Sequence, residues 1–148
     1  MRKKIYIKIF GRNIGFTLTE LLIVVVIVGL LATLALPMLV KTLEKAKVGE
    51  ATSNLNLIRT GQKIYFLEYG QFSPSVSDIN IEDPNSDTAR YFYYTASDGG
   101  DDLESNFTAT AERGGSGAVS APEPYQNDNY IMQKQGAIRG RFTTGEEL

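Results

Sequence analysis

Hydrophobic side chains are concentrated near the start of the chain, where the 20 residues 21–40 include no charged residue. Twenty residues at about 1.5 Å each span about 30 Å, the thickness of the hydrocarbon core of a bilayer. The pattern therefore predicts a membrane helix. Glu20 lies at the N-terminal end of this helix, and Thr17 lies three residues earlier. This spacing fits an S/T-x-x-E capping box, in which each side chain satisfies a free backbone N–H of the first turn.

Beyond residue 40 the pattern becomes that of an amphipathic helix, with charged positions beside an apolar stripe that can pack on a domain. Gly70 and Pro74 favour an end after Tyr69, so one helix is predicted over residues 16–69. Pro37 has no N–H, and a curve or kink is expected there. The polar positions are Lys41, Glu44, Lys45, Lys47 and Glu50, and the stripe consists of Leu36, Leu39, Leu43, Ala51, Leu55, Ile58, Tyr65 and Tyr69.

The rest of the chain has the pattern of a turn-rich loop followed by short strands. Residues 70–89 are rich in Ser, Asp, Asn and Pro, with Val76, Ile79 and Ile81 as candidate anchors. A long surface loop is expected over residues 114–129. The β-prone or alternating segments that predict strands are residues 90–96, 106–112, 130–134 and 138–142, the last two joined as a hairpin by a turn at residues 135–137.

Composition limits the chemistry that is available to the chain. Its 148 residues include no Cys and no His, which excludes disulfides, thiol chemistry and the commonest general base. No nucleophile has an evident base beside it. We therefore expect no enzyme.

Charge is unevenly distributed along the sequence. Residues 1–15 carry five basic residues and no acid, whereas residues 16–148 carry ten basic and seventeen acidic residues, a net charge of −7. A basic segment before a membrane helix indicates a cytoplasmic N-terminus and export of the remainder. The acidic remainder argues against a general nucleic-acid partner, which requires basic surface to replace phosphate counterions.

A secretory signal is an alternative interpretation of the first 35 residues, because Thr33-Leu34-Ala35 is a passable cleavage site. The uncharged run is, however, longer than the roughly 7–15 residues of a signal core. Glu20 would also have no role at the edge of such a core.

The residues from Gly15 onward closely resemble the N-terminus of type IV pilin precursors and the related pseudopilins. In that family a basic leader ends in Gly, a dedicated peptidase cuts before Phe, the new terminus is N-methylated, and the fifth mature residue is Glu. Gly15, Phe16 and Glu20 match these positions, and Pro37 lies where the family has a proline in its membrane helix. The resemblance covers about residues 15–57, and only the overall organisation matches beyond.

The resemblance implies an α+β pilin fold, in which a long N-terminal helix packs on a small antiparallel sheet. The implied organisation is a removed leader (1–15), a transmembrane and polymerisation half-helix (16–40), and an exported domain (41–148) made of an amphipathic half-helix (41–69), a loop (70–89) and the sheet (90–148). As in relatives, the stretch from Gly29 to Pro37 is expected to melt in the filament. Glu20 is expected to pair with the amino group of Phe16 in a neighbouring subunit, and capping alone is the alternative.

The implied function is that of a structural subunit of a type IV pilus, used for adhesion, motility or uptake. The alternative is a pseudopilin acting in protein export by type II secretion, and a third reading is an anchored domain that never polymerises. The implied partners are copies of the chain in a helical filament, the prepilin peptidase, an inner-membrane platform protein and an assembly ATPase. The implied location is the inner membrane before assembly and a cell-surface filament afterwards.

Two short patterns suggest chemistry outside this framework. Asp98, Asp101 and Asp102 form an oxygen-rich loop that is a weak candidate for Ca²⁺, as major pseudopilins bind calcium in a C-terminal loop. The cluster lacks EF-hand spacing, so we expect an acidic turn without a metal, and no cofactor. Asn106-Phe107-Thr108 matches a glycosylation acceptor, but it falls on a predicted strand.

Overall fold

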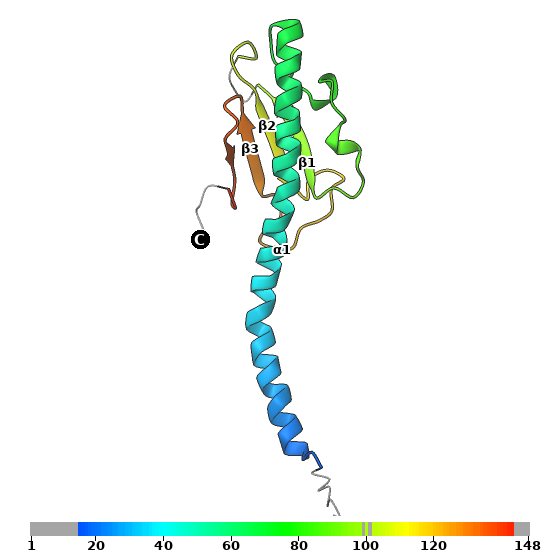
Figure 1. Ribbon diagram of the computed structural model, residues 1–148, viewed down its shortest axis with the longest axis vertical. Coiled ribbons are helices and arrows are strands. Elements are labelled where there is room, and N and C mark those ends of the chain that lie inside the picture. Colours follow the sequence, from blue (N-terminus) through cyan, green and yellow to red (C-terminus); the bar gives the residue numbers. More distant parts are fainter. Residues whose placement is uncertain (1–14, 99, 101, 144–148) are drawn as a thin grey trace, which may run out of the picture. The chain divides into compact units, whose positions relative to one another are not determined.

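The computed structural model describes residues 15–98, 100 and 102–143. The chain divides into two compact units, Met1–Val40 and Lys41–Leu148. Helix α1 (Leu18–Tyr69) has residues in both units and is continuous in its α-helical assignment, including at Gly29 and Pro37 (Figure 1). The helix starts two residues later than predicted, because Thr17 is its cap, and ends at Tyr69 as predicted. Gly70 terminates it with a positive φ of 72°.

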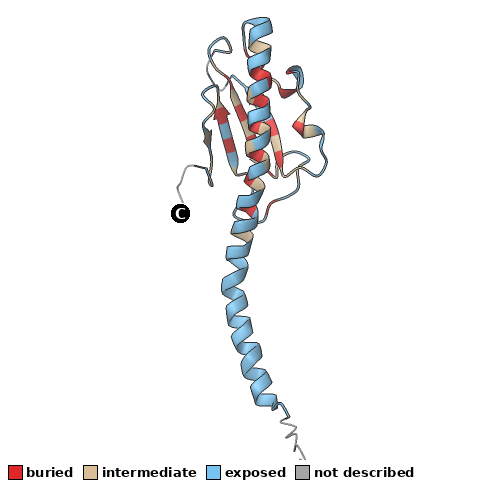
Figure 2. Ribbon diagram, viewed as in Figure 1, coloured by how far each residue is buried: buried red, intermediate tan, exposed pale blue. Residues whose placement is uncertain are grey.

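The described residues of the first unit have no tertiary core. Every side chain of residues 15–39 is exposed, and the exposed fraction of the large apolar side chains ranges from 47% at Val24 to 82% at Leu18. Figure 2 shows this part of α1 as uniformly exposed. By length and composition, α1 includes a segment that could cross a membrane.

The second unit contains a four-stranded antiparallel sheet in the order β1-β2-β3-β4, so each strand pairs with its neighbour in sequence. The strands are β1 (Phe92–Ser97), β2 (Thr108–Arg113), β3 (Asn129–Gln133) and β4 (Ile138–Arg139). The first three lie within two residues of the predicted bounds, and the hairpin of β3 and β4 is confirmed. The predicted five residues of the last strand were too many. A turn, in which Thr143 N donates to Gly140 O at 3.0 Å, ends pairing after Arg139.

The core of the second unit lies between α1 and one face of the sheet (Figures 1 and 2). Strand β2 alternates as predicted, since Phe107, Ala109 and Ala111 are fully buried. The helix contributes Val48, Ala51, Leu55 and Ile58, and the remaining buried apolar residues of the cluster are Phe72, Val76, Ile79, Phe92, Tyr94, Tyr130 and Met132.

The predicted helix stripe was correct at its centre and wrong at its ends. Leu36, Leu39 and Leu43 are more than half exposed, as is Tyr69. The face that packs on the sheet begins instead at Glu44, which was predicted to be a solvent-facing polar position and is only 4% exposed. The reason is that the chain supplies a buried cation opposite this residue, as described below.

Residues 70–89 form the expected loop, and it contains two short 3₁₀ helices, η1 (Val76–Asp78) and η2 (Pro84–Ser86). Val76 and Ile79 are buried anchors, as predicted, and Ile81 is half-buried. The loop approaches α1 so closely that a Cβ on Gly61 would lie 2.6 Å from Ile81 Cγ2. Any larger residue at position 61 would force Ile81 to shift, so glycine allows the loop to pack closely on the helix.

Hydrogen bonds from side chains also hold the loop of residues 70–89 to α1 and to β1. The Gln62 side chain donates to Ser73 O and accepts from Ser73 N, both at 2.8 Å and both buried. The Asn85 side chain forms the same pair of bonds with the backbone of Tyr94, at 2.9 Å each. Asn85 thereby occupies the outer edge of β1 where a further strand would pair, which protects that edge.

Candidate functional site

The first turn of α1 forms the capping box that the sequence predicted. Glu20 N donates to Thr17 Oγ1 at 3.2 Å, and Thr17 N and Thr17 Oγ1 donate to Glu20 Oε2 at 2.9 and 2.7 Å. Leu21 N donates to Thr17 O, which starts the helical ladder. All of these bonds are exposed. The box therefore satisfies the first free N–H groups of the helix with local side chains.

Glu20 uses only one of its carboxylate oxygens in this cap. Both bonds from Thr17 reach Oε2, and Oε1 accepts no hydrogen bond from the described residues. A carboxylate has about four acceptor positions. Capping and a second ionic contact are therefore compatible, and the two interpretations of Glu20 do not exclude each other.

The junction of Gly15 and Phe16 lies directly before this cap. The Phe16 side chain is 73% exposed, and a Cβ on Gly15 would meet no atom within 4 Å. The rest of the predicted leader, residues 1–14, lies outside the described residues. The site that the structure describes is thus an open Gly15–Phe16 bond, a carboxylate one helical turn away, and the exposed apolar surface of α1 that follows.

The stretch from Gly29 to Pro37 is the weakest part of that apolar surface. Gly costs about 1 kcal/mol and Pro about 3 kcal/mol in a helix relative to Ala. Since Pro37 has no N–H, the carbonyl of Thr33 lacks its usual donor four residues on. The isolated subunit is helical here, and the melting expected in the filament stays a prediction.

A buried ionic cluster in the second unit was missed from the sequence. Arg113 Nε donates to Glu44 Oε2 at 2.8 Å and Arg113 Nη2 to Glu44 Oε1 at 3.3 Å, with the two side chains 2% and 4% exposed. Arg113 also donates to the carbonyls of Tyr91, Val119 and Ser120. Lys47 Nζ lies 2.7 Å from Glu44 Oε1 at the solvent side. Burial raises the pKa of Glu44, but Arg113 and Lys47 outweigh burial and hold that pKa below its ordinary value.

Two sequence signals pointed to this pair. Arg113 continues the inward alternation of Phe107, Ala109 and Ala111 on β2, and Glu44 lies four residues before Val48 on the buried side of α1. Each would have been recognised as inward by period alone. The pair ties the start of the amphipathic half-helix to the end of β2.

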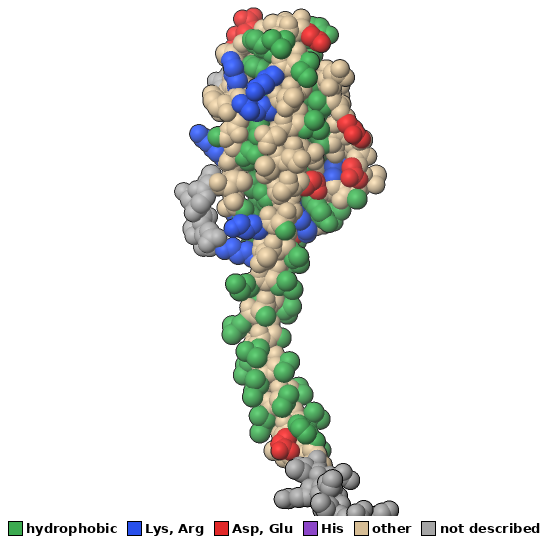
Figure 3. Space-filling model, viewed as in Figure 1, with side chains coloured by type: hydrophobic (Ala, Val, Ile, Leu, Met, Phe, Trp, Pro, Cys, Tyr) green, Lys and Arg blue, Asp and Glu red, His purple; other side chains and the backbone are tan. Residues whose placement is uncertain are grey.

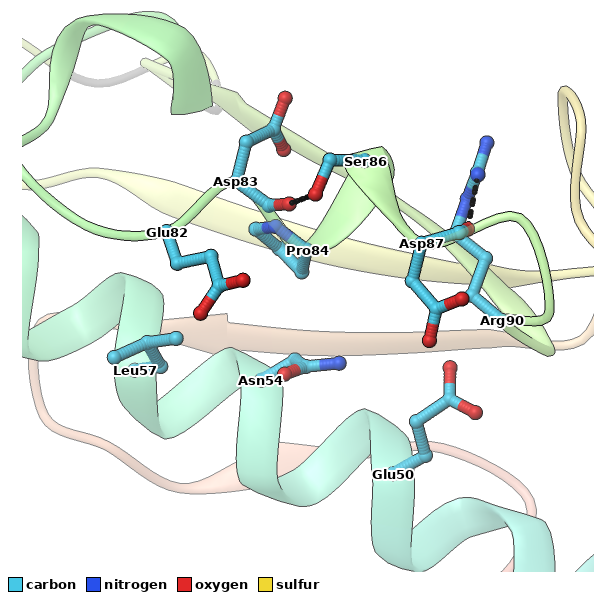
Figure 4. Close-up of a pocket in the computed structure, with 9 residues that line it drawn as sticks. All are labelled: Glu50, Asn54, Leu57, Glu82, Asp83, Pro84, Ser86, Asp87 and Arg90. Carbon is cyan, nitrogen blue, oxygen red and sulfur yellow. Dashed lines mark hydrogen bonds between the residues drawn. The ribbon is translucent and has the colours of Figure 1, made fainter.

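A hollow of about 240 Å³ lies between α1 and the loop in the second unit (Figure 4). Glu50, Asn54 and Leu57 line it from α1, and Glu82, Asp83, Pro84, Ser86, Asp87 and Arg90 line it from the loop. Glu50 accepts from Tyr91 N at 3.1 Å and from the hydroxyl of Tyr94 at 3.1 Å. Burial chiefly, and the Glu50 charge in addition, raise the pKa of Tyr94, so its hydroxyl stays protonated and donates. Among the described residues, no carboxylates are grouped so as to hold a metal ion.

The weak calcium candidates occupy a turn. Asp98 Oδ1 accepts from Gly100 N and Asp102 Oδ1 accepts from Glu104 N, each at 3.2 Å, as capping carboxylates do. Asp101 lies outside the described residues, and calcium binding stays an untested prediction. Asn106 lies just before β2, half-buried, and its Oδ1 accepts from Lys134 N at 3.3 Å.

The prokaryotic N-terminal methylation motif matches residues 11–36, which include the Gly15–Phe16 junction and Glu20. The chain is 39% identical over 90 residues to the type IV major pilin protein PilA of Myxococcus xanthus (strain DK1622), covering 61% of this chain and 40% of that protein. It is 39% identical over 77 residues to the type IV major pilin protein PilE1 of Neisseria gonorrhoeae, covering 49% and 44%. It is 36% identical over 61 residues to the type II secretion system core protein G of Aeromonas hydrophila, covering 41% and 43%.

These matches span less than half the length of each of these curated relatives. Together the motif and the relatives support the pilin and pseudopilin family for this chain. The fold agrees, because a long N-terminal helix packed on a four-stranded antiparallel sheet is the α+β arrangement that the resemblance implied. The relatives are named as major pilins and as a secretion-system core protein, which agrees with the prediction that this chain is not an enzyme.

Proposed function

We propose that the chain is a structural subunit of a type IV pilus filament and polymerises through the first part of α1. The observation that carries the proposal is the apolar surface of residues 18–39, every side chain of which is exposed. Exposure of such a surface to water costs roughly 25 cal/mol per Å². The helix therefore requires lipid before assembly and other copies of itself afterwards. The relatives described as major pilins support this reading.

Exchange between those two surroundings changes the free energy little. Lipid tails and a bundle of apolar helices are both dry and hydrophobic, so a subunit can leave one for the other without exposing apolar surface to water. This suits a filament that grows from the membrane and returns to it. The proposed location is the inner membrane before assembly and the cell surface afterwards.

Assembly in this proposal begins with cleavage between Gly15 and Phe16 and methylation of the new amino group. The open space around Gly15 supports this step, because a small residue lets the backbone enter a protease cleft. The enzyme would be a prepilin peptidase. A membrane platform protein and an ATPase would then drive incorporation of the subunit.

In the proposal, Glu20 forms an ionic contact with the amino group of Phe16 in a neighbouring subunit. After cleavage, the ammonium of Phe16 and the Glu20 carboxylate lie at similar depth in apolar surroundings, where an unpaired charge costs several kcal/mol. Glu20 Oε1 is left without a described donor by the cap, so it can accept from the ammonium of a neighbouring copy. The pairing would set the axial register of an incoming subunit, since apolar contact is non-directional.

The substitution Glu20→Gln separates pairing from capping, because the amide keeps an acceptor oxygen for Thr17 and loses the charge. Under the pairing hypothesis the variant is cleaved and stays in the membrane but yields few filaments. Abundant filaments composed only of Glu20→Gln subunits would refute the pairing role. Cleavage is monitored by mass spectrometry and filaments by electron microscopy of sheared surface material.

The function itself is tested by shearing cells that express the chain and examining the released material. Filaments whose mass spectrum contains this subunit support the proposal, and a subunit found only in membranes contradicts it. The second candidate is a pseudopilin, favoured by the match to the secretion-system core protein G. It predicts that deletion abolishes protein export while long surface filaments are absent.

A further inference from the structure

The outward face of α1 in the second unit carries an apolar ridge that the other described residues leave uncovered. Leu57, Ile64 and Leu67 are 39%, 41% and 84% exposed. Their spacing of seven and three residues places them on one side of a helix. This side differs from the buried one, which contains Ala51, Leu55 and Ile58.

Carboxylates line one edge of this ridge. The acidic flank consists of Glu50, Glu82, Asp83 and Asp87, which all line the hollow that Leu57 also borders (Figure 4). Glu50 is held in place by Tyr91 N and the Tyr94 hydroxyl, and Asp83 and Asp87 by backbone N–H groups. No member forms an ion pair with any described residue, Arg90 included. Glu50, Asp83 and Asp87 are thus held in position by hydrogen bonds, and none of the four carboxylates forms an ion pair with a described cation.

Cations line the opposite edge. The basic flank consists of Arg59, Lys63 and Lys134. Arg59 donates to the carbonyls of Lys134 and Gln135 at 3.0 and 3.2 Å, and Lys134 Nζ donates to Ser105 O at 3.2 Å. Lys63 lies one helical turn beyond Arg59. Arg59 and Lys134 are held by carbonyls and not by carboxylates, and Lys63 forms no described ion pair, so the positive charge is also retained.

The two flanks lie on opposite sides of the helix. Glu50 and Arg59 are nine residues apart, which is two and a half turns at 3.6 residues per turn. In Figure 3 acidic side chains gather mainly on the right of the globular unit and basic ones mainly on the left, with α1 between them. Across its width, the face therefore carries the acidic flank, then the apolar ridge, then the basic flank.

We propose that this face docks on a second copy of the chain, with the acidic flank of one subunit against the basic flank of the next. A surface with opposite charges on its two edges is complementary to itself. Each contact of this kind is heterologous and leaves one flank of each sign free, so it can repeat from subunit to subunit along a filament. A nucleic acid would be repelled by the acidic flank, and a basic foreign protein would leave the basic flank unused. The inference rests on the proposed function, and supplies the lateral contact between exported domains.

Charge reversal tests the contact in a homopolymer. Lys63 and Glu82 are both exposed and form no described hydrogen bond, so Lys63→Glu and Glu82→Lys leave the fold intact. Either single variant places like charges across every contact and should lower the filament yield per membrane subunit roughly tenfold or more. The double variant restores opposite charges and should return the yield to near that of the wild type. Arg139→Glu is the matched control, because Arg139 pairs with the exposed Ile131 on the outer face of the sheet.

Crosslinking gives an independent readout in the full-length chain, which has no native cysteine. Filaments carrying both Lys63→Cys and Glu82→Cys should yield a ladder of multimers with a short thiol-reactive crosslinker, whereas either single-cysteine variant should stay monomeric, because the contact does not bring two copies of the same position together. Normal yield from both charge-reversed variants, or a double variant no better than the singles, would overturn the contact while wild-type filaments still support the proposed function. A wild-type chain that forms no filaments would overturn both.

Discussion

Removal of the Glu44 charge should destabilise the second unit strongly. In Glu44→Gln the Arg113 guanidinium stays buried, 2% exposed, without its counter-ion. Removing one partner of a buried pair costs about 3–5 kcal/mol. Arg113 keeps its bonds to the carbonyls of Tyr91, Val119 and Ser120, and the substituted amide keeps one acceptor oxygen. We therefore expect a loss of about 3 kcal/mol, the lower end of that range.

This loss can be measured by urea unfolding of the full-length chain in detergent micelles. Seven of the eight tyrosines lie between Tyr65 and Tyr130, so the near-ultraviolet circular dichroism reports on the second unit. With a urea slope of about 1–3 kcal/mol per M, a loss of about 3 kcal/mol lowers the midpoint by about 1–3 M. Lys47→Gln is the control, because its ion pair with Glu44 is 25% exposed on the lysine side and should contribute below about 1 kcal/mol. A midpoint for Glu44→Gln equal to that of Lys47→Gln would show that burial of the pair has no energetic consequence.

Three further outcomes are expected. The pKa of Glu44 is lowered in the folded state, so its contribution to the free energy of unfolding is complete above the unfolded pKa of about 4.3 and is lost as the pH falls through the folded pKa. Wild type should therefore lose stability faster than Glu44→Gln below about pH 4. Parallel plots of stability against pH for the two proteins would contradict this. Mass spectrometry of the mature subunit should show a chain that begins at Phe16 and is heavier by one methyl group, whereas a terminus near Leu36 would support a secretory signal. A filament reconstruction should show loss of helical hydrogen bonding between Gly29 and Pro37, and an unbroken helix there would be contrary to the melting hypothesis.

Local pattern predicted the elements whose stability is itself local. The apolar run of residues 21–40, the Thr17–Glu20 cap and the end of α1 at Tyr69 all depend on residues within a few positions of one another. The strands and the β3–β4 hairpin were also found, since a period of two and a turn at Gly136 are short-range signals.

Tertiary structure decided what depends on residues far apart in the chain. The pair of Glu44 and Arg113 joins positions 69 residues apart. The periodicity of each element can predict that these side chains face inward, but it cannot predict that they will meet each other. The order of the strands and the edge contact of Asn85 with Tyr94 likewise follow from packing. The same holds for the acidic and basic flanks, because Glu82 and Glu50 share a hollow only when the loop lies against α1. Sequence determines which side chains face inward along each element, and three-dimensional packing determines which of them meet.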